Sequence, residues 1–398
     1  MLFLIIISLP FSIKINSILI ILLVINSLIK DKEIIYQPLT NLPLLLVSSP
    51  FVLSLLALIY SDNLDQGIFI LEKSLPLVAF PLVFSLSSRL KPGIFEKITF
   101  LFPMVIVIVA IICFTHSIWL IISNNSLIDQ SKLSDREYYY FTYYHLAGAV
   151  HMNPIYLGMY TNFAISLVLE RLLKQKSKTL LVMFVFLTLF LFMLSSKINI
   201  IIYFILLITF IFHFRKKVRF VYRYGFILAT FSILIVFFVK PIKDRVININ
   251  YLNYDIERGH ISFWNGANLR LAIWECAKAP ILNNWLLGVG TGDEKKELMD
   301  SYAVKKFNIG LLTKYNTHNQ MLQFCLRFGI LAAIFVMITN FLIPIIVGYR
   351  WDYGLYIFSI IVFINSLTEV IFATQKGVVF YSLFVTLFLH NRSSKSPK

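Results

Sequence analysis

The stretch from Asn316 to Ile330 (NTHNQMLQFCLRFGI) sets a His–Asn pair at the start of a long apolar run. A neutral imidazole where water meets lipid is suited to proton transfer, because it can accept a proton near pH 7. We therefore interpret His318 as a candidate general base. The alternative is a histidine that caps the helix or anchors it at the membrane surface.

Polar side chains follow this histidine at helical spacing. Asn319, Gln323 and Arg327 are four residues apart, so a helix would carry them on one face over roughly 12 Å. Polar residues within a membrane usually face the interior of the bundle or a wet cavity. The spacing predicts a polar stripe that supports the histidine. For Arg327 the alternative is a side chain that reaches outward to the lipid headgroups.

Two cations are candidate ligands for a phosphate. Arg270 opens the segment LRLAIWECAKAPILNNWLLGVGTGD, and a guanidinium can grip a phosphate through two hydrogen bonds. Lys197 lies in MLSSKINII, a very short turn between two apolar runs, where a charge must reach solvent or an anion. Attraction to anionic headgroups is the alternative for Arg270, and simple exposure to solvent is the alternative for Lys197.

Two further polar positions occur near the ends of predicted spans. Glu369 is either paired with a basic neighbour such as Lys376 or part of the site, and the sequence does not choose between these. Pro154, in HMNPIY, predicts a kink in its span.

Metal and nucleotide sites are not indicated. The turn Gly288–Gly292 is not followed by Lys-Ser/Thr and does not open a βαβ unit, so it fits neither phosphate-binding fingerprint. Asp293 and Glu294 are adjacent rather than spaced to hold a metal, and no His/Cys/Asp cluster occurs elsewhere. We expect a tight turn at these glycines, no metal and no cofactor.

Composition defines the setting for these residues. The chain has 398 residues, of which 58% are hydrophobic and 14% charged, and its mean hydropathy is +0.79. Continuous apolar runs, rather than alternating ones, approach the roughly 17–25 residues of a membrane-crossing helix. Within lipid, a helix satisfies its own backbone polar groups. The sequence predicts an all-α polytopic membrane protein.

We expect about twelve transmembrane helices in a single integral membrane domain, 1–398. One large loop, 241–317, lies between the ninth and tenth spans. Its residues Arg270, Trp274 and Ala277 predict a short amphipathic helix along the membrane surface. The first two spans are alternatively one helix broken near Pro10 and Lys14. The expected spans are 2–13, 16–29, 42–60, 74–88, 98–122, 146–170, 180–195, 198–214, 224–240, 318–347, 355–372 and 377–390.

The formal net charge of +16 has a topological explanation. Lysines and arginines gather in short connectors that twelve spans place on one side, which the positive-inside rule makes cytoplasmic. The large loop then faces the opposite side. The basicity is therefore topological, and we expect membrane lipids and no nucleic acid among the partners. Three cysteines offer no disulfide framework, and the first ten residues lack the features of a cleavable signal.

The order of these motifs resembles the O-antigen ligase and O-antigen polymerase superfamily of bacterial envelope glycosyltransferases. The large loop before the tenth span agrees with that resemblance. The motifs that carry it are Ser195-Ser196-Lys197, Arg270 with Trp274, the Gly288–Gly292 turn, His318-Asn319, Leu322-Gln323 and Gly329.

The resemblance implies a GT-C-like helical fold in the bacterial cytoplasmic (inner) membrane, with its active site facing the periplasm. The donor would be a glycan on undecaprenyl diphosphate, the acceptor lipid A-core or another glycan, and the transfer metal-independent and inverting. His318 would be the general base, and Arg270 would stabilise the diphosphate leaving group. The family usually has an arginine at the position of Lys197. The lysine keeps the positive charge of that arginine but loses its bidentate fork.

Several functions compete with an O-antigen ligase. A polymerase and a transferase to protein use the same donor chemistry, and we favour the ligase narrowly. A flippase or transporter for lipid-linked oligosaccharides belongs to another class, but repeated halves with charges near the bilayer midplane are not found. A purely structural protein leaves the polar stripe unexplained. Fixed cations at a water-poor interface would stabilise a departing diphosphate without a metal.

Overall fold

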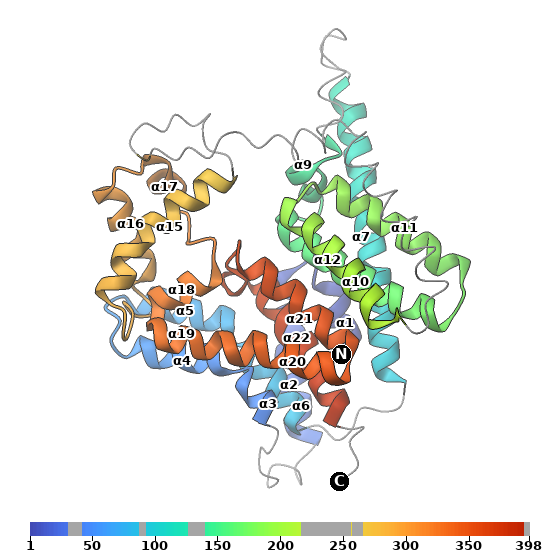
Figure 1. Cartoon of the computed structure of the whole chain (residues 1–398), viewed down its shortest axis with the longest axis horizontal. Coiled ribbons are helices and arrows are strands. Elements are labelled where there is room, and N and C mark those ends of the chain that lie inside the picture. The colour runs from blue at the N-terminus through green and yellow to red at the C-terminus, as the bar shows by residue number, and fades with distance from the viewer. Residues whose placement is uncertain (31–41, 87–92, 126–139, 216–255, 257–265, 394–398) are drawn as a thin grey trace. The chain divides into compact units, whose positions relative to one another are not determined.

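The computed structural model describes residues 1–30, 42–86, 93–125, 140–215, 256 and 266–393. Every element of regular secondary structure in those ranges is a helix (Figure 1). The all-α expectation is therefore confirmed for the described part of the chain. The chain divides into two compact units, residues 1–16 with 92–249 and residues 17–91 with 250–398.

The first unit is organised around α10 (Pro154–Lys174), which packs against several of the described helices and is buried along its length from Pro154 to Leu169. Its neighbours are α7 (Ile94–Asn125), α9 (Tyr143–Gly148), α11 (Lys178–Met193) and α12 (Lys197–His213). α1 (Leu2–Ser8) packs on α7, and the first turn of α2 (Ile13–Lys30) belongs to the same unit.

The second unit is organised around α22 (Gln375–Ser393), in which every residue from Gly377 to Asn391 is buried. α22 contacts α6, α21, α3, α5 and the short 3₁₀ helix η6. Besides α22 and the rest of α2, the described helices of this unit are α3 (Leu42–Leu46), α4 (Ser49–Leu58), α5 (Leu64–Ser74), α6 (Pro76–Leu86), α15 (Gly266–Asn283), α16 (Glu294–Val304), α17 (Asn308–Thr313), α18 (Gln320–Phe328), α19 (Ile330–Met337), the π-helix η5 (Ile338–Leu342), α20 (Ile343–Trp351), α21 (Tyr353–Ser366) and η6 (Ile371–Ala373).

Short polar residues fix where several of these helices begin. Each accepts a hydrogen bond from a backbone N–H two or three residues further along, which satisfies a donor that the first helical turn leaves free. The capping residues are Asn63, Asn153, Ser177, Asn319 and Asp352.

Three described helical stretches are long and apolar enough to cross a membrane. They are Leu64–Leu86, Ile94–Ser123 and Ile330–Trp351. Shorter apolar helices accompany them, among them Lys178–Met193 and Lys197–His213. The expected total of twelve spans stays a prediction, because the ninth span, 224–240, lies outside the described residues.

The predicted tenth span, 318–347, is wrong as a single helix. Gly329 has φ of +85°, and this left-handed backbone ends α18 and begins α19. A Cβ atom at Gly329 would lie 2.1 Å from the carbonyl oxygen of Leu286, so the glycine also permits a close approach of two backbones. The polar stripe is thus confined to α18 and its cap.

Several other predicted spans differ from the observed helices, either in where they begin or in being divided. Pro154 is the first residue of α10, so it begins a helix and does not kink the predicted span 146–170. The span 42–60 is divided into α3 and α4. α1 ends at Ser8 and α2 begins at Ile13, a break close to the expected Pro10.

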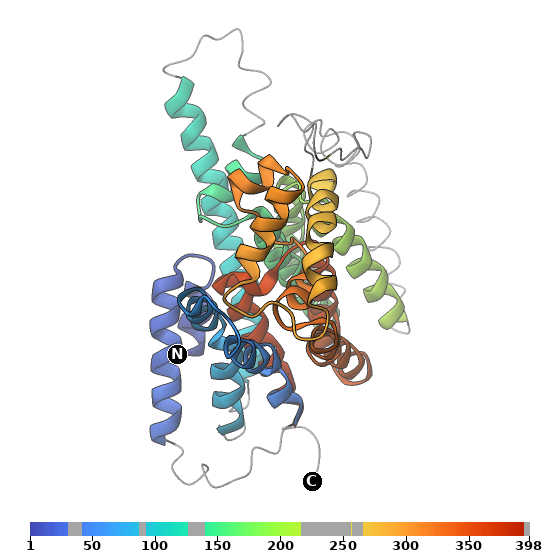
Figure 2. The same cartoon turned by 90° about the vertical axis from the view of Figure 1, so that its left-hand side faces the viewer.

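The described part of the large loop, from residue 266, is helical. α15, α16 and α17 lie together in both views (Figures 1 and 2), and α15 and α16 also contact α18. A helix is present at Arg270, as expected, and is α15, while its position along the membrane surface stays a prediction. The loop helices therefore form a layer that holds the start of α18.

Candidate active site

Arg270 is fixed by three oxygen atoms. Its Nη1 donates to the carbonyl of Gly266, 2.8 Å away, one turn earlier in α15. Its Nε donates to the carbonyl of Thr368 at 2.9 Å, and its Nη2 donates to Oε1 of Glu369 at 2.8 Å. The side chain of Arg270 is 21% exposed. It is therefore held rigidly while part of it still faces solvent.

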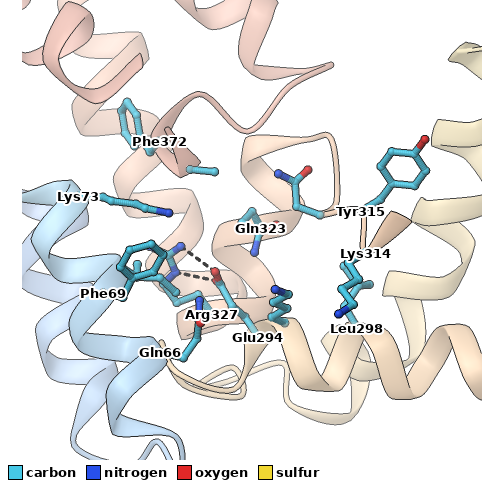
Figure 3. A pocket seen from close by; sticks show the side chains of 14 residues that line it. Gln66, Phe69, Lys73, Glu294, Leu298, Lys314, Tyr315, Gln323, Arg327 and Phe372 are labelled. Atoms are coloured by element: carbon cyan, nitrogen blue, oxygen red, sulfur yellow. Dashed lines mark hydrogen bonds and ion pairs between the residues drawn. The ribbon is translucent and has the colours of Figure 1, made fainter. Parts of the chain in front are cut away.

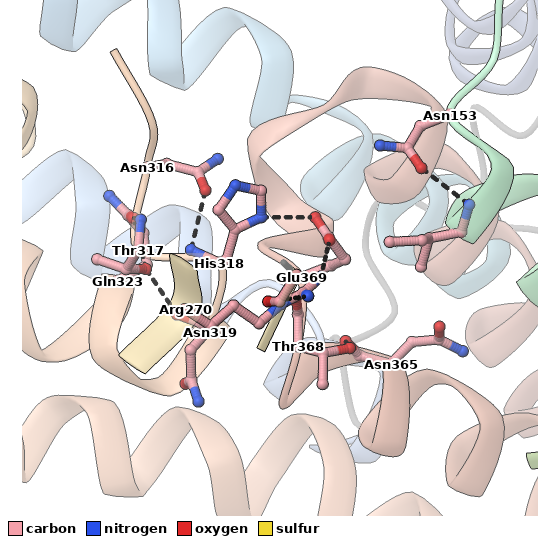
Figure 4. A network of polar contacts seen from close by, with 12 residues as sticks. Asn153, Arg270, Asn316, Thr317, His318, Asn319, Gln323, Asn365, Thr368 and Glu369 are labelled. Atoms are coloured by element: carbon pink, nitrogen blue, oxygen red, sulfur yellow. Dashed lines mark hydrogen bonds and ion pairs between the residues drawn. The ribbon is translucent and has the colours of Figure 1, made fainter. Parts of the chain in front are cut away.

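Glu369 joins the two leading candidate residues. It lies between α21 and η6 and is buried. While Oε1 accepts the bond from Arg270, Oε2 lies 3.2 Å from Nδ1 of His318 (Figure 4). The acid that the sequence left unassigned is thus paired with Arg270 and is also the hydrogen-bond partner of the histidine.

His318 has an unusual backbone conformation. Its φ is +45°, a left-handed value that costs a non-glycine residue on the order of 1–3 kcal/mol and persists only when its surroundings impose it. Asn316 Oδ1 accepts from the backbone N–H of His318 at 3.0 Å, and Oγ1 of Thr317 donates to the carbonyl of Asn319 at 2.8 Å. The strained turn directs the imidazole toward Glu369.

The tautomer of His318 follows from its partner. A carboxylate that faces an imidazole nitrogen accepts a hydrogen bond from it, as Glu369 also accepts one from Arg270. Nδ1 then carries the hydrogen and Nε2 keeps its lone pair, the form of imidazole that can take a proton from a substrate. The side chain of His318 is 20% exposed.

Asn319 and Gln323, which are predicted to support the histidine, make hydrogen bonds near the start of α18. Asn319 caps α18 through Oδ1 and donates its Nδ2 to the carbonyl of Leu367 at 3.1 Å. Gln323 accepts at Oε1 from the backbone N–H of Thr317, and the same oxygen lies 2.9 Å from the Thr317 hydroxyl oxygen. Trp274, one turn after Arg270, donates its indole N–H to the carbonyl of Thr317. α15 and α18 therefore hold the segment that carries His318.

Arg327 does not reach outward to headgroups. It is 4% exposed and makes a bidentate pair with Glu294, with Nε–Oε2 of 2.8 Å and Nη2–Oε1 of 3.0 Å. Its Nη1 donates to the hydroxyl of Ser54. Sequence reasoning missed Glu294, because no local spacing links it to a residue 33 positions away. This buried pair braces α18 against α4 and α16.

The glycine-rich turn is confirmed and locks the end of α18. Gly288 and Gly290 have φ of +69° and +98°, values that favour glycine. The backbone N–H groups of Val289 and Gly290 donate to the carbonyls of Leu326 and Arg327. The turn supplies partners for carbonyls at the C-terminal end of α18, in place of the helical bonds that stop there.

Lys197 belongs to the first unit, where it is the exposed first residue of α12. The preceding Ser195 has φ of +49°, and Ser196 is the N-cap residue. Asn199 donates to Oγ of Ser196 and to the carbonyl of Ile155, which fixes this turn against the start of α10. The predicted role of Lys197 at a diphosphate stays a prediction.

A pocket of about 230 Å³ opens near the segment that carries His318, although His318, Arg270 and Glu369 are not among its lining residues (Figure 3). Tyr315 and Asn316 form one wall, and Tyr315 also contacts the ring of His318 with centroids 5.4 Å apart. Gln323 and Arg327 line the pocket, so two members of the predicted stripe face a cavity. The remaining walls come from α5, α16 and η6.

Part of the chain is similar to a known protein family. No curated protein matches the chain. The family model described as O-antigen ligase matches residues 182–337. That segment includes Lys197, Arg270, His318, Gln323 and Arg327, and ends before Glu369. The resemblance to the O-antigen ligase and polymerase superfamily seen in the sequence is confirmed over residues 182–337.

Proposed function

We propose that this chain is an O-antigen-ligase-like glycosyltransferase of the bacterial inner membrane. It transfers a glycan from undecaprenyl diphosphate to an acceptor hydroxyl at the periplasmic face. The observation that carries the proposal is the carboxylate of Glu369, which joins the imidazole of His318 to the guanidinium of Arg270. The family match supports the reaction class.

His318 activates the acceptor in this proposal. Nε2 removes the proton of the acceptor hydroxyl as its oxygen attacks the anomeric carbon. Glu369 holds the ring through Nδ1 and stabilises the imidazolium that forms, as the carboxylate does in a Ser–His–Asp triad. General base catalysis of this kind contributes about 10²–10⁴ in rate.

Arg270 assists the leaving group. The bond between the anomeric carbon and the diphosphate oxygen breaks as the new glycosidic bond forms on the opposite face, which inverts the centre. A guanidinium has five N–H groups, and three of them are used by the oxygens of Gly266, Thr368 and Glu369. The other two can donate to phosphate oxygens. Loss of one such donor costs about 10²–10³ in rate.

Substitution of His318 separates the transferase from a transporter. His318→Ala should abolish glycan transfer in membrane vesicles while translocation of the lipid-linked donor continues. His145→Ala removes a histidine of the first unit and serves as the control, with transfer unchanged. Normal transfer by His318→Ala would overturn the proposal, and loss of translocation in the same variant would favour a flippase.

The surface glycans of a deletion strain identify the acceptor class. A ligase predicts long chains that accumulate on the carrier lipid and are missing from the cell surface. A polymerase predicts surface molecules capped with a single repeat unit. We expect the first outcome, and the second would assign the same chemistry to polymerisation.

A further inference from the structure

The pocket beside His318 carries an excess of positive charge that the proposed reaction does not use. Lys73 of α5, Lys295 of α16 and Lys314 after α17 all line it. Lys73 is half-buried, while Lys295 and Lys314 are exposed. In the part of the chain that the structure describes, no carboxylate is within ion-pair distance of these three ammonium groups. Three like charges around one cavity favour an anion within it.

The other polar side chains of the pocket reinforce that preference. Glu294 is a lining carboxylate, but Arg327 engages both of its oxygens. Asn316 and Gln323 each use their side-chain oxygen within the protein, toward the N–H of His318 and toward Thr317. Their NH₂ groups remain as donors. The pocket therefore offers donors and positive charge to a ligand rich in acceptor oxygens.

The apolar walls indicate more than a bare ion. Phe69, Tyr315 and Phe372 line the same cavity (Figure 3). Nζ of Lys73 lies 3.8 Å from the ring centroid of Phe69, a cation–π contact that fixes the ammonium group against an aromatic face. Aromatic faces beside hydrogen-bond donors suit a sugar ring, which has apolar C–H faces and a polar edge. A diphosphate has no apolar face to use them.

The volume limits the ligand to one ring. At about 230 Å³ the pocket is smaller than the roughly 300–1,000 Å³ of sites for drug-sized ligands. We propose that it binds a single anionic sugar residue, a pyranose with a carboxylate or phosphate group, belonging to a glycan substrate. This assignment rests on the proposed transferase function and adds an acidic glycan as its substrate class. Tyr315 and Asn316 would place that residue next to His318.

Ligand-dependent thermal stability of the purified full-length protein in detergent tests the proposal. The probes are glucuronate, glucose 6-phosphate, glucose, inorganic phosphate and geranyl diphosphate. Glucuronate or glucose 6-phosphate should raise the melting temperature of the wild-type protein at concentrations where glucose and inorganic phosphate do not. Equal stabilisation by glucose or by inorganic phosphate would overturn the assignment of an anionic sugar.

A triple variant locates the binding. Lys73→Gln/Lys295→Gln/Lys314→Gln should raise the half-saturating concentration of the anionic sugar at least about tenfold, since hydrogen bonds to charged groups contribute at least 1.4 kcal/mol. The control carries the same change of charge at exposed lysines outside the pocket and should bind normally. Equal weakening in the control, or weakening for geranyl diphosphate alone, would contradict the proposal. The control substitutions are Lys278→Gln, Lys296→Gln and Lys306→Gln.

His318→Ala separates this inference from the transferase function. If both proposals hold, His318→Ala loses glycan transfer and keeps binding of the anionic sugar. If the variant transfers glycan normally while the lysine triple variant loses sugar binding, the sugar site stands and the base assignment fails. If His318→Ala loses transfer but the triple variant binds the sugar as the wild type does, the sugar site is wrong and the base assignment stands.

Discussion

Replacement of Glu369 by glutamine tests the link between His318 and Arg270, because it removes one acceptor oxygen and keeps the shape of the side chain. Both neighbours of the carboxylate are donors, Nη2 of Arg270 at 2.8 Å and Nδ1 of His318 at 3.2 Å. An amide has one oxygen, and Arg270 can only donate to it. The amide NH₂ is then turned toward His318 Nδ1, which must become an acceptor.

The consequence for catalysis follows from the tautomer. With Nδ1 accepting, the hydrogen of neutral His318 moves to Nε2, and the ring can no longer take a proton from the acceptor hydroxyl. The expected loss is the whole contribution of a general base, about 10²–10⁴ in rate. The stability cost should be small, on the order of 1–2 kcal/mol, because Arg270 keeps an acceptor and is partly exposed.

The assay is glycan transfer in membranes that carry each variant at a matched protein level, with the melting temperature measured in parallel. Glu275→Gln is the control, since Glu275 lies in α15 and, like Glu369, accepts a hydrogen bond from a cationic side chain, here from Nζ of Lys305 at 2.8 Å. It should transfer glycan at nearly the wild-type rate. If Glu369→Gln is as active as this control while His318→Ala is inactive, the carboxylate does not set the tautomer and the reasoning fails.

Three further outcomes follow from the packing. Arg327→Met should lower the free energy of unfolding by about 3–5 kcal/mol, because Glu294 is left as an unpaired buried charge, and adding Glu294→Leu should restore most of it in denaturant titrations. Gly329→Ala should prevent accumulation of folded protein, seen as loss of the monodisperse peak in size-exclusion chromatography. Gly148→Ala, which has no atom within 4 Å of the added Cβ, should give the same peak as the wild-type protein. The hydrogen bond from Lys305 lowers the pKa of the Glu275 carboxyl. This pair therefore stabilises the fold at pH values above the ordinary pKa of the carboxyl, and the stabilisation is lost as the pH falls through the lowered pKa. Glu275→Gln should make the melting temperature less dependent on pH over that acidic range.

The parts of the site that the sequence predicted are those with local signals. A His–Asn pair at the start of an apolar run marks the beginning of α18, and Asn319 indeed caps it. Regular spacing after Arg270 predicted α15, and three closely spaced glycines predicted the turn. Each of these features depends on residues that are close together in the sequence, so the sequence alone is enough to predict it.

The parts that the sequence left open depend on distant contacts. Glu369 is 51 positions from His318 and 99 from Arg270, so no spacing rule relates them. Arg327 was equally compatible with an outward or an inward direction until the position of Glu294 was known. Long-range pairing of charges is set by the tertiary fold, which one sequence does not reveal.

The broken helices show the limit of hydropathy. An apolar run that contains Gly329 is as hydrophobic when it turns at the glycine as when it continues, so composition cannot detect the break. The break depends on the backbone of Leu286, which packs against the glycine from a distant turn. At Pro154 the signal was present, because asparagine followed by proline is typical of a helix start.

In the proposed reaction, the carboxylate of Glu369 also couples activation of the acceptor at His318 to departure of the diphosphate at Arg270. In the resting site the negative charge of Glu369 is divided between Arg270 and the ring of His318. When the ring takes a proton it becomes a cation and attracts the carboxylate more strongly, which leaves more of the positive charge of Arg270 to act on a departing diphosphate. The guanidinium would then bind the transition state better than the bound donor, and only such differential binding accelerates a chemical step. A site with the arginine and the histidine on separate carboxylates would lack this coupling.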